Sequence, residues 1–116
     1  MKIKLSMPQA LFLLKQNIAK DFAQWHSRSP YGDEEQKAER AEQFAQAITI
    51  EEGRKYIKVI TGTSVWGFIM KADDQKFKAG DILKAASWAA PARNKPRGNV
   101  LEGDFSWVRW TGPEYL

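Results

Sequence analysis

The repeat of apolar residues changes once along this chain, near residue 50. In the first 48 residues they recur every three or four positions, as in an amphipathic α-helix. From Lys55 onward the repeat is two, with many β-branched and aromatic residues, as in β-strands. The chain of 116 residues is therefore predicted to be one α+β domain, 1–116, with two N-terminal helices packed on an antiparallel sheet of four to five strands. The helical half covers about 6–48 and the β-rich, basic half about 49–116.

Capping signals mark the beginnings of both helices. Ser6 with Gln9 forms a capping box, and a proline is tolerated in the first helical turn, so the first helix is predicted from here to about Ser27. Asp33 with Gln36 repeats the pairing and predicts a second helix over about 34–47. The first helix is expected to turn one stripe toward the core, consisting of Leu11, Leu14, Ile18, Phe22 and Trp25.

The clearest strand pair is 55–61 with 64–71. Gly62 and Thr63 lie between the two runs, and glycine at the first central position suits a two-residue hairpin turn. Three shorter segments are predicted to add strands, namely 49–50, 82–86 and 105–110.

Composition excludes several classes of protein. The absence of cysteine rules out disulfides, thiolate catalysis and cysteine zinc sites, and the single histidine, His26, is expected to be structural. No apolar run approaches the length of a membrane span, and the first residues do not resemble a secretory signal, so a cytoplasmic protein is expected. We expect no metal, no cofactor and no catalytic residues, and hence a protein that is not an enzyme.

The positive charge lies in the second half of the chain. Residues 1–52 carry seven Lys and Arg against eight Asp and Glu, a balance of −1, whereas residues 53–116 carry eleven against six, a balance of +5. A basic half indicates an anionic partner, although basic composition by itself does not say which one.

The predicted ligand-binding segment is the loop 87–104, which is expected to lack regular structure. A connection of this length in a small domain is usually functional or disordered. It carries Arg93, Lys95, Arg97 and Asn99 as hydrogen-bond donors, and the fork of an arginine side chain matches phosphate oxygens. The alternative is a solvated loop with ordinary charges.

Aromatic and basic residues near this loop are predicted to assist it. Bases stack on exposed aromatic rings, with about 1–3 kcal/mol for each contact, although large rings are also good core material. The candidates are Trp88, Trp107 and Trp110, together with the cations Arg109 and Lys84.

The C-terminal half resembles a group of small bacteriophage-encoded accessory proteins of unassigned function. The resemblance covers residues 56–116 and rests on Val65–Phe68, Gly80–Lys84, Ala90–Arg93 with Arg97–Asn99, and Trp110–Leu116. It implies a non-enzymatic binder in the host cytoplasm that blocks host defence or adapts host machinery. It assigns no functional residues.

Three functions remain open at this point. The first is a phage accessory protein that binds a phosphate-bearing ligand, either single-stranded nucleic acid or a nucleotide messenger that it sequesters to counter host defence, in a site that two copies of the chain could share. The second is a protein–protein inhibitor of a host defence, transcription or nuclease enzyme, with exposed tryptophan and arginine as anchors. The third is a small nucleotide-acting enzyme with Asp81 or Asp104 as base. Against this third function, the chain lacks the clustered acid, base and nucleophile that such active sites normally have.

Overall fold

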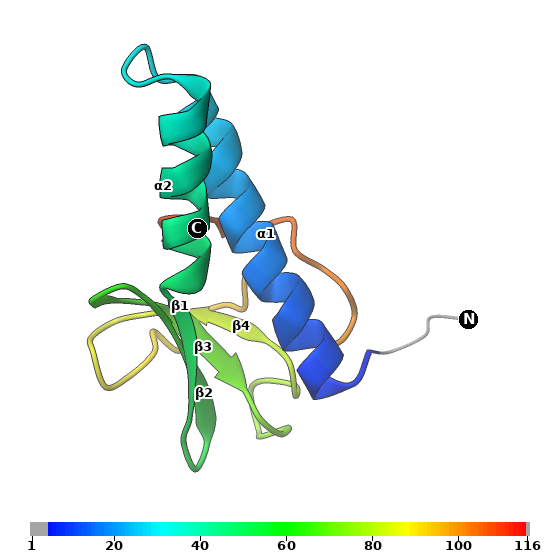
Figure 1. Cartoon of the computed structure of the whole chain (residues 1–116). Coiled ribbons are helices and arrows are strands. Elements are labelled where there is room, and N and C mark those ends of the chain that lie inside the picture. The colour runs from blue at the N-terminus through cyan, green and yellow to red at the C-terminus, as the bar shows by residue number, and fades with distance from the viewer. Residues whose placement is uncertain (1–4, 116) are drawn as a thin grey trace.

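The computed structural model describes residues 5–115, so residues 1–4 and Leu116 lie outside it. The prediction that the first residues are not a secretory signal falls partly on residues 1–4, outside the described part of the chain. Two helices are followed by a four-stranded antiparallel sheet and a separate two-stranded ladder (Figure 1). The predicted α+β architecture is confirmed.

Both predicted helices form, and their capping boxes are present. Helix α1 (Met7–Ser27) begins where the Ser6 hydroxyl accepts the Gln9 N–H at 3.3 Å and the Gln9 side chain accepts the Ser6 N–H at 3.2 Å. Helix α2 (Glu34–Gln46) begins with the same reciprocal pair between Asp33 and Gln36. These bonds satisfy backbone donors that have no partner inside a helix, which fixes where each helix starts.

The main sheet has the order β1-β2-β3-β4, so each strand lies beside its neighbour in the chain. Its strands are β1 (Ile48–Glu52), β2 (Tyr56–Thr61), β3 (Ser64–Met70) and β4 (Ile82–Lys84). The hairpin between β2 and β3 confirms the predicted turn, because Gly62 has a φ of 64°, which favours glycine.

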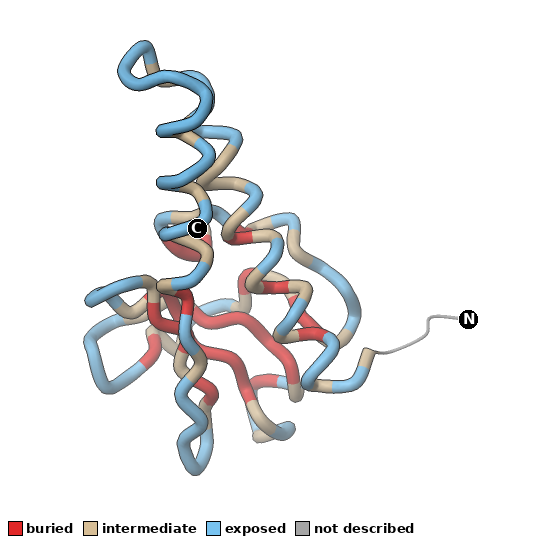
Figure 2. The backbone as a smooth tube through the Cα atoms, in the orientation of Figure 1, coloured by how far each residue is buried: buried red, intermediate tan, exposed pale blue. Residues whose placement is uncertain are grey.

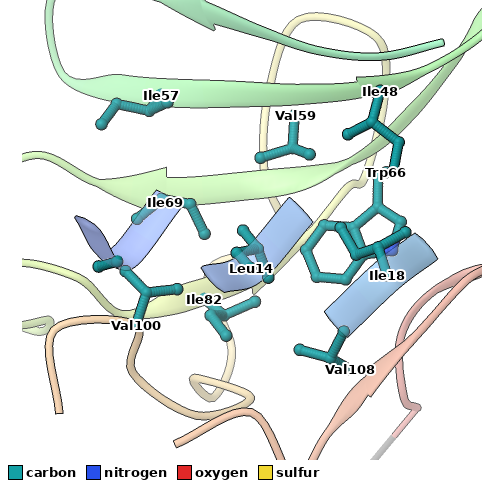
Figure 3. Close-up of a cluster of buried hydrophobic side chains, with 11 residues drawn as sticks. Leu14, Ile18, Ile48, Ile57, Val59, Trp66, Ile69, Ile82, Val100 and Val108 are labelled. Carbon is teal, nitrogen blue, oxygen red and sulfur yellow. The ribbon is translucent and has the colours of Figure 1, made fainter. Parts of the chain in front are cut away.

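Helix α1 crosses one face of this sheet and buries its apolar stripe there (Figures 1 and 3). Leu14 and Ile18 are fully buried against the sheet, and burial of each such side chain is worth about 1.5–3 kcal/mol. The residues of the sheet and the C-terminal segment that complete this core include Ile48, Ile57, Val59, Trp66, Ile69, Ile82, Val100 and Val108.

The two helices extend beyond the sheet as a hairpin whose connecting loop is far from it (Figure 1). This accounts for the elongated dimensions of 49 × 35 × 25 Å. Helix α2 buries no residue, and the distant end of the hairpin is largely exposed (Figure 2). The expectation that Trp25 belongs to the core is therefore wrong: its side chain is 56% exposed, because α1 has already passed the sheet at that point.

The prediction of a strand over 105–110 is wrong in extent. Only β5 (Val108–Arg109) is extended, and it pairs with β6 (Gly112–Pro113) in a ladder outside the main sheet. Local bonds bend the chain before β5: the Asp104 carboxylate accepts the Ser106 N–H and hydroxyl, and the Val108 N–H donates to the Phe105 carbonyl. Such turns compete with strand pairing.

The segment 87–104 lacks regular strands or helices, as expected, but part of it follows the edge of β4. The Ala92 N–H donates to the Lys84 carbonyl at 2.7 Å, and the Arg97 N–H donates to the Ile82 carbonyl at 2.8 Å. Ile82 in turn donates to the Gly98 carbonyl at 3.1 Å. The loop therefore covers what would otherwise be an open sheet edge.

Candidate functional site

The face of the sheet opposite α1, which we call the outer face, carries both apolar and basic residues. Phe68, Met70 and Leu83 form a small buried cluster on it, which Phe77 joins from the segment after β3. Lys58 of β2 is paired with Phe68 in the strand register, so it lies on the same face. The outer face therefore has an apolar centre with a cation at its border.

Arg93 is held at this face by an acid and a phenol. Its guanidinium lies 2.6 Å from the Asp74 carboxylate and 2.6 Å from the Tyr56 hydroxyl. These two bonds raise the pKa of Arg93. The main-chain N–H of Phe77 and the guanidinium of Arg93 both donate to the Asp74 carboxylate. These bonds hold the pKa of Asp74 well below its usual range. Arg93 is thus committed to a local network.

Arg97 and Asn99 do not present their donors to solvent. Arg97 is 2% exposed, and it donates to the side chain of Asn94 and the main-chain carbonyls of Lys95 and Glu114. Asn99, 5% exposed, donates to the Ala79 carbonyl and the Asp81 carboxylate. Of the four donors predicted in the loop, Lys95 alone is exposed.

Trp88 is the predicted aromatic residue that the structure leaves most accessible, with 55% of its surface exposed. The Lys58 ammonium lies 4.7 Å from the centre of its ring, within the range of a cation–π contact. Beside it is a hollow of about 240 Å³ lined by Arg54, Lys55 and Lys58, with Glu51 as its acidic residue. We call Arg54, Lys55, Lys58 and Trp88 the outer basic surface.

The remaining predicted residues lie with the C-terminal segment on the other side of the sheet. Lys84 donates to the Pro113 carbonyl at 2.8 Å, and burial, with the charge of Arg97, lowers its pKa. The Arg109 guanidinium lies 2.6 Å from the Glu114 carboxylate. Trp107 is half-buried, and Trp110 packs edge-on against Phe22 and Phe44 of the helices.

The structure thus divides the nine predicted residues between two surfaces and the interior. Trp88 and Arg93 lie on the outer face, whereas Lys84, Arg109 and Trp110 accompany the C-terminal segment. Sequence reasoning missed Lys58, although a signal was present: in the alternation of strand 55–61 it falls on the face opposite Ile57 and Val59. Arg54 and Lys55 carried no comparable signal, because turn residues have no fixed face.

The two carboxylates considered for an enzyme are both used in local structure. Asp81 is buried and accepts the Lys78 N–H at 2.9 Å as well as the Asn99 amide. Asp104 accepts from Ser106. Over residues 5–115 no three His, Cys, Asp or Glu side chains gather as metal ligands would. Neither described helix is long and apolar enough to cross a bilayer.

Fold and surface together define a small α+β protein with a projecting helical hairpin and a basic, tryptophan-bearing outer face. The chain belongs to a family of unknown function, DUF7717, which matches residues 2–113. No curated protein and no solved structure matches it.

Proposed function

We propose that the outer basic surface binds single-stranded nucleic acid, with phosphates at Arg54, Lys55 and Lys58 and a base stacked on Trp88. The observation that carries this proposal is the Lys58 ammonium 4.7 Å from an indole that is itself more than half exposed. An exposed ring beside a cation is the pairing with which proteins bind unpaired bases and their phosphates.

The shape of the surface favours a strand over a free nucleotide. The hollow beside Lys58 has a volume of about 240 Å³, which is smaller than the roughly 300–1,000 Å³ of pockets that enclose small ligands. Lys55, in the turn before β2, and Lys58, within β2, both line the hollow, and Lys55 also lies 3.5 Å from the Asp74 carboxylate. A strand carries a phosphate at each nucleotide, so it can use several of these cations at once while a base stacks on Trp88.

The biological role we propose follows from the resemblance to bacteriophage accessory proteins. A non-enzymatic protein that coats or withholds single strands in the host cytoplasm would interfere with host nucleases or other defence functions that act on them. This role needs affinity for strands without strict sequence preference, which stacking and phosphate contacts supply.

The test is fluorescence anisotropy of a labelled oligothymidylate titrated with the protein at several salt concentrations. We expect Trp88→Ala to weaken binding about tenfold or more, because a stacked base contributes about 1–3 kcal/mol. Lys58→Gln should weaken binding and reduce the slope of log affinity against log salt concentration by about one, which corresponds to the loss of one phosphate contact.

Matched controls separate this surface from general charge and aromatic content. Lys20→Gln removes the same charge from an exposed position on α1, and Phe12→Ala removes an exposed ring from that helix, so both should bind like the parent. Equal losses in all four variants, or no binding by the parent at low salt, would overturn the proposal. A host protein that copurifies in stoichiometric amount, without oligonucleotide binding, would favour the protein–protein inhibitor instead.

A further inference from the structure

A second hollow lies on the helical hairpin, away from the outer face. It has a volume of about 530 Å³ and forms where the C-terminal half of α1 meets residues 109–111. Its aromatic walls are Trp25 and Trp110, whose ring centres are 5.0 Å apart. Because this volume falls in the range of small-molecule sites, the hollow is large enough to hold a ligand the size of a nucleotide.

One wall of the hollow is fixed and the other is open. Trp110 packs edge-on against Phe22 and Phe44, at ring-centre distances of 5.2 Å and 5.9 Å. The main-chain N–H of Trp110 donates to the Asp21 carboxylate at 2.8 Å. Trp25 is 56% exposed and has a ring surface available to a ligand. A planar group can therefore stack on Trp25 without displacing the packed side chains behind it.

Among the charged groups of the hollow, one cation and one carboxylate oxygen have no partner within residues 5–115, and the polar side chains of Gln24 and Thr111 also line it. Arg28 makes no ion pair or side-chain hydrogen bond within residues 5–115, and Asp21 uses one carboxylate oxygen, so the other has no partner in that part of the chain. Arg109, the other arginine of the hollow, is paired with Glu114. Arg28 is the residue that follows the last turn of α1, seven positions after Asp21, which corresponds to about 10 Å along the helix axis.

From this arrangement we infer that the hollow binds a nucleotide whose base carries an exocyclic amine. The base stacks on Trp25, its amino group donates to the free oxygen of Asp21, and the phosphate pairs with Arg28. Carboxylates accept hydrogen bonds from the amino group of cytosine in the same way elsewhere. The inference does not rest on the proposed function, because the hollow shares no residue with the outer basic surface.

The chemistry makes a sharp prediction about which bases bind. Uracil has a carbonyl where cytosine has an amine, and a carbonyl oxygen placed against the Asp21 carboxylate leaves two acceptors facing each other. A site that uses an acceptor to hold a ligand's donor discriminates against a ligand that lacks the donor, because the acceptor then loses its partner. CMP should therefore bind more tightly than UMP.

The experiment is an NMR titration of the whole ¹⁵N-labelled protein, in which the indole N–H signals of its five tryptophans are followed separately. CMP, cytidine and UMP are the probes, and Trp25→Ala and Trp110→Phe assign the two relevant signals. We expect CMP to shift the signals of Trp25 and Trp110, and UMP to bind at least about tenfold more weakly. Absence of any shift in both signals with saturating CMP would overturn the inference, as would equal affinities for CMP and UMP.

Two substitutions test the roles of the polar residues. Arg28→Gln should weaken CMP about tenfold and leave cytidine unchanged, because only the phosphate contact is lost; equal effects on CMP and cytidine would contradict that assignment. Asp21→Asn should abolish the preference for CMP over UMP, because an amide both donates and accepts. Arg40→Gln removes an exposed arginine from α2 and should change nothing.

Further arms of the titration separate the sources of the ligand and the two sites. Lys58→Gln should leave the CMP titration unchanged. If the outer basic surface does not bind nucleic acid, the CMP titration can therefore still show binding in the hollow, and the two results are distinguishable. An oligonucleotide that ends in a cytidine phosphate and shifts the same two indole signals with much higher affinity than CMP would identify the ligand as the end of a strand. Similar affinities would identify a free nucleotide.

Discussion

The indole N–H of Trp66 donates to the main-chain carbonyl of Arg109 at 2.7 Å, which ties the buried centre of β3 to the C-terminal segment. Figure 3 shows the Trp66 ring beside Ile18 of α1 and above Val108. One side chain thus joins the helix, the sheet and the segment that carries Arg109 and Trp110. The position of the hollow on the hairpin depends on this contact.

Trp66→Phe should lower the free energy of unfolding by about 1–3 kcal/mol, because it leaves the Arg109 carbonyl without its donor and removes part of a buried ring. Urea unfolding followed by circular dichroism would measure this loss. Trp107→Phe is the matched control, since Trp107 is half-buried and its indole donates no hydrogen bond in the described part of the chain. Similar losses in both variants would contradict a special role for the Trp66 bond.

Arg97→Ala should destabilise the fold by about 3 kcal/mol, whereas Lys95→Ala should change stability by less than about 0.5 kcal/mol. Arg97 is buried and donates to two main-chain carbonyls and one amide oxygen, all of which would lose their partner. Lys95 is exposed. Thermal unfolding of the two variants measures this difference, and a fully stable Arg97→Ala protein would contradict a structural role for these hydrogen bonds.

Gly98→Ala should be far more damaging than Gly103→Ala, although both glycines have positive φ values. A methyl group on Gly98 would lie 2.5 Å from the Asp104 carbonyl oxygen, while one on Gly103 would meet no atom within 4 Å. We expect about 1 kcal/mol for Gly103→Ala from backbone strain alone and about 3 kcal/mol or more for Gly98→Ala. Chemical denaturation of both variants tests this difference, and equal costs would mean that the close approach at Gly98 is relieved by movement of the loop.

Asp74→Asn should destabilise the protein at neutral pH, and the difference from the parent should shrink as the pH falls below about 4. The pKa of Asp74 is lowered in the folded protein by main-chain and Arg93 donors, so its stabilising contribution is present above the ordinary aspartate pKa of 3.8. The contribution is lost as the pH falls toward the lowered value. Melting temperatures across this range would show the convergence, with Glu102→Gln, an exposed acid, as the control that stays parallel to the parent.

The helix beginnings and the central hairpin were predictable because their causes are local. Ser6 with Gln9 and Asp33 with Gln36 are capping pairs within one turn, and Gly62 supplies the positive φ that its turn requires. The strand predicted over 105–110 failed for a related reason. Its composition suits a strand, yet the Asp104–Ser106 turn, which is equally local, bends the chain before it can pair with the sheet.

The candidate sites were only partly predictable, because exposure depends on what covers a residue. Arg93, Arg97 and Asn99 have the composition of a phosphate-binding loop, but their donors are used within the protein. Arg93 and Asn99 donate to Asp74 and Asp81, which are distant in sequence, and Arg97 donates to the distant Glu114 carbonyl as well as to its neighbours Asn94 and Lys95. Conversely, nothing near Trp25 in the sequence indicates that α1 continues past the sheet and leaves this ring in solvent.

Sequence alone determined the order of helices and strands, the helix caps, the hairpin turn and the concentration of positive charge after residue 52, since each depends on neighbouring residues or on simple counting. Tertiary structure decided which cations are free. Lys58 lies partly exposed against Trp88 because of its place in the β2 pleat, and Arg97 is buried because the C-terminal segment returns over it. Packing between segments far apart in the chain determines desolvation, and desolvation separates a structural arginine from one that can bind a ligand.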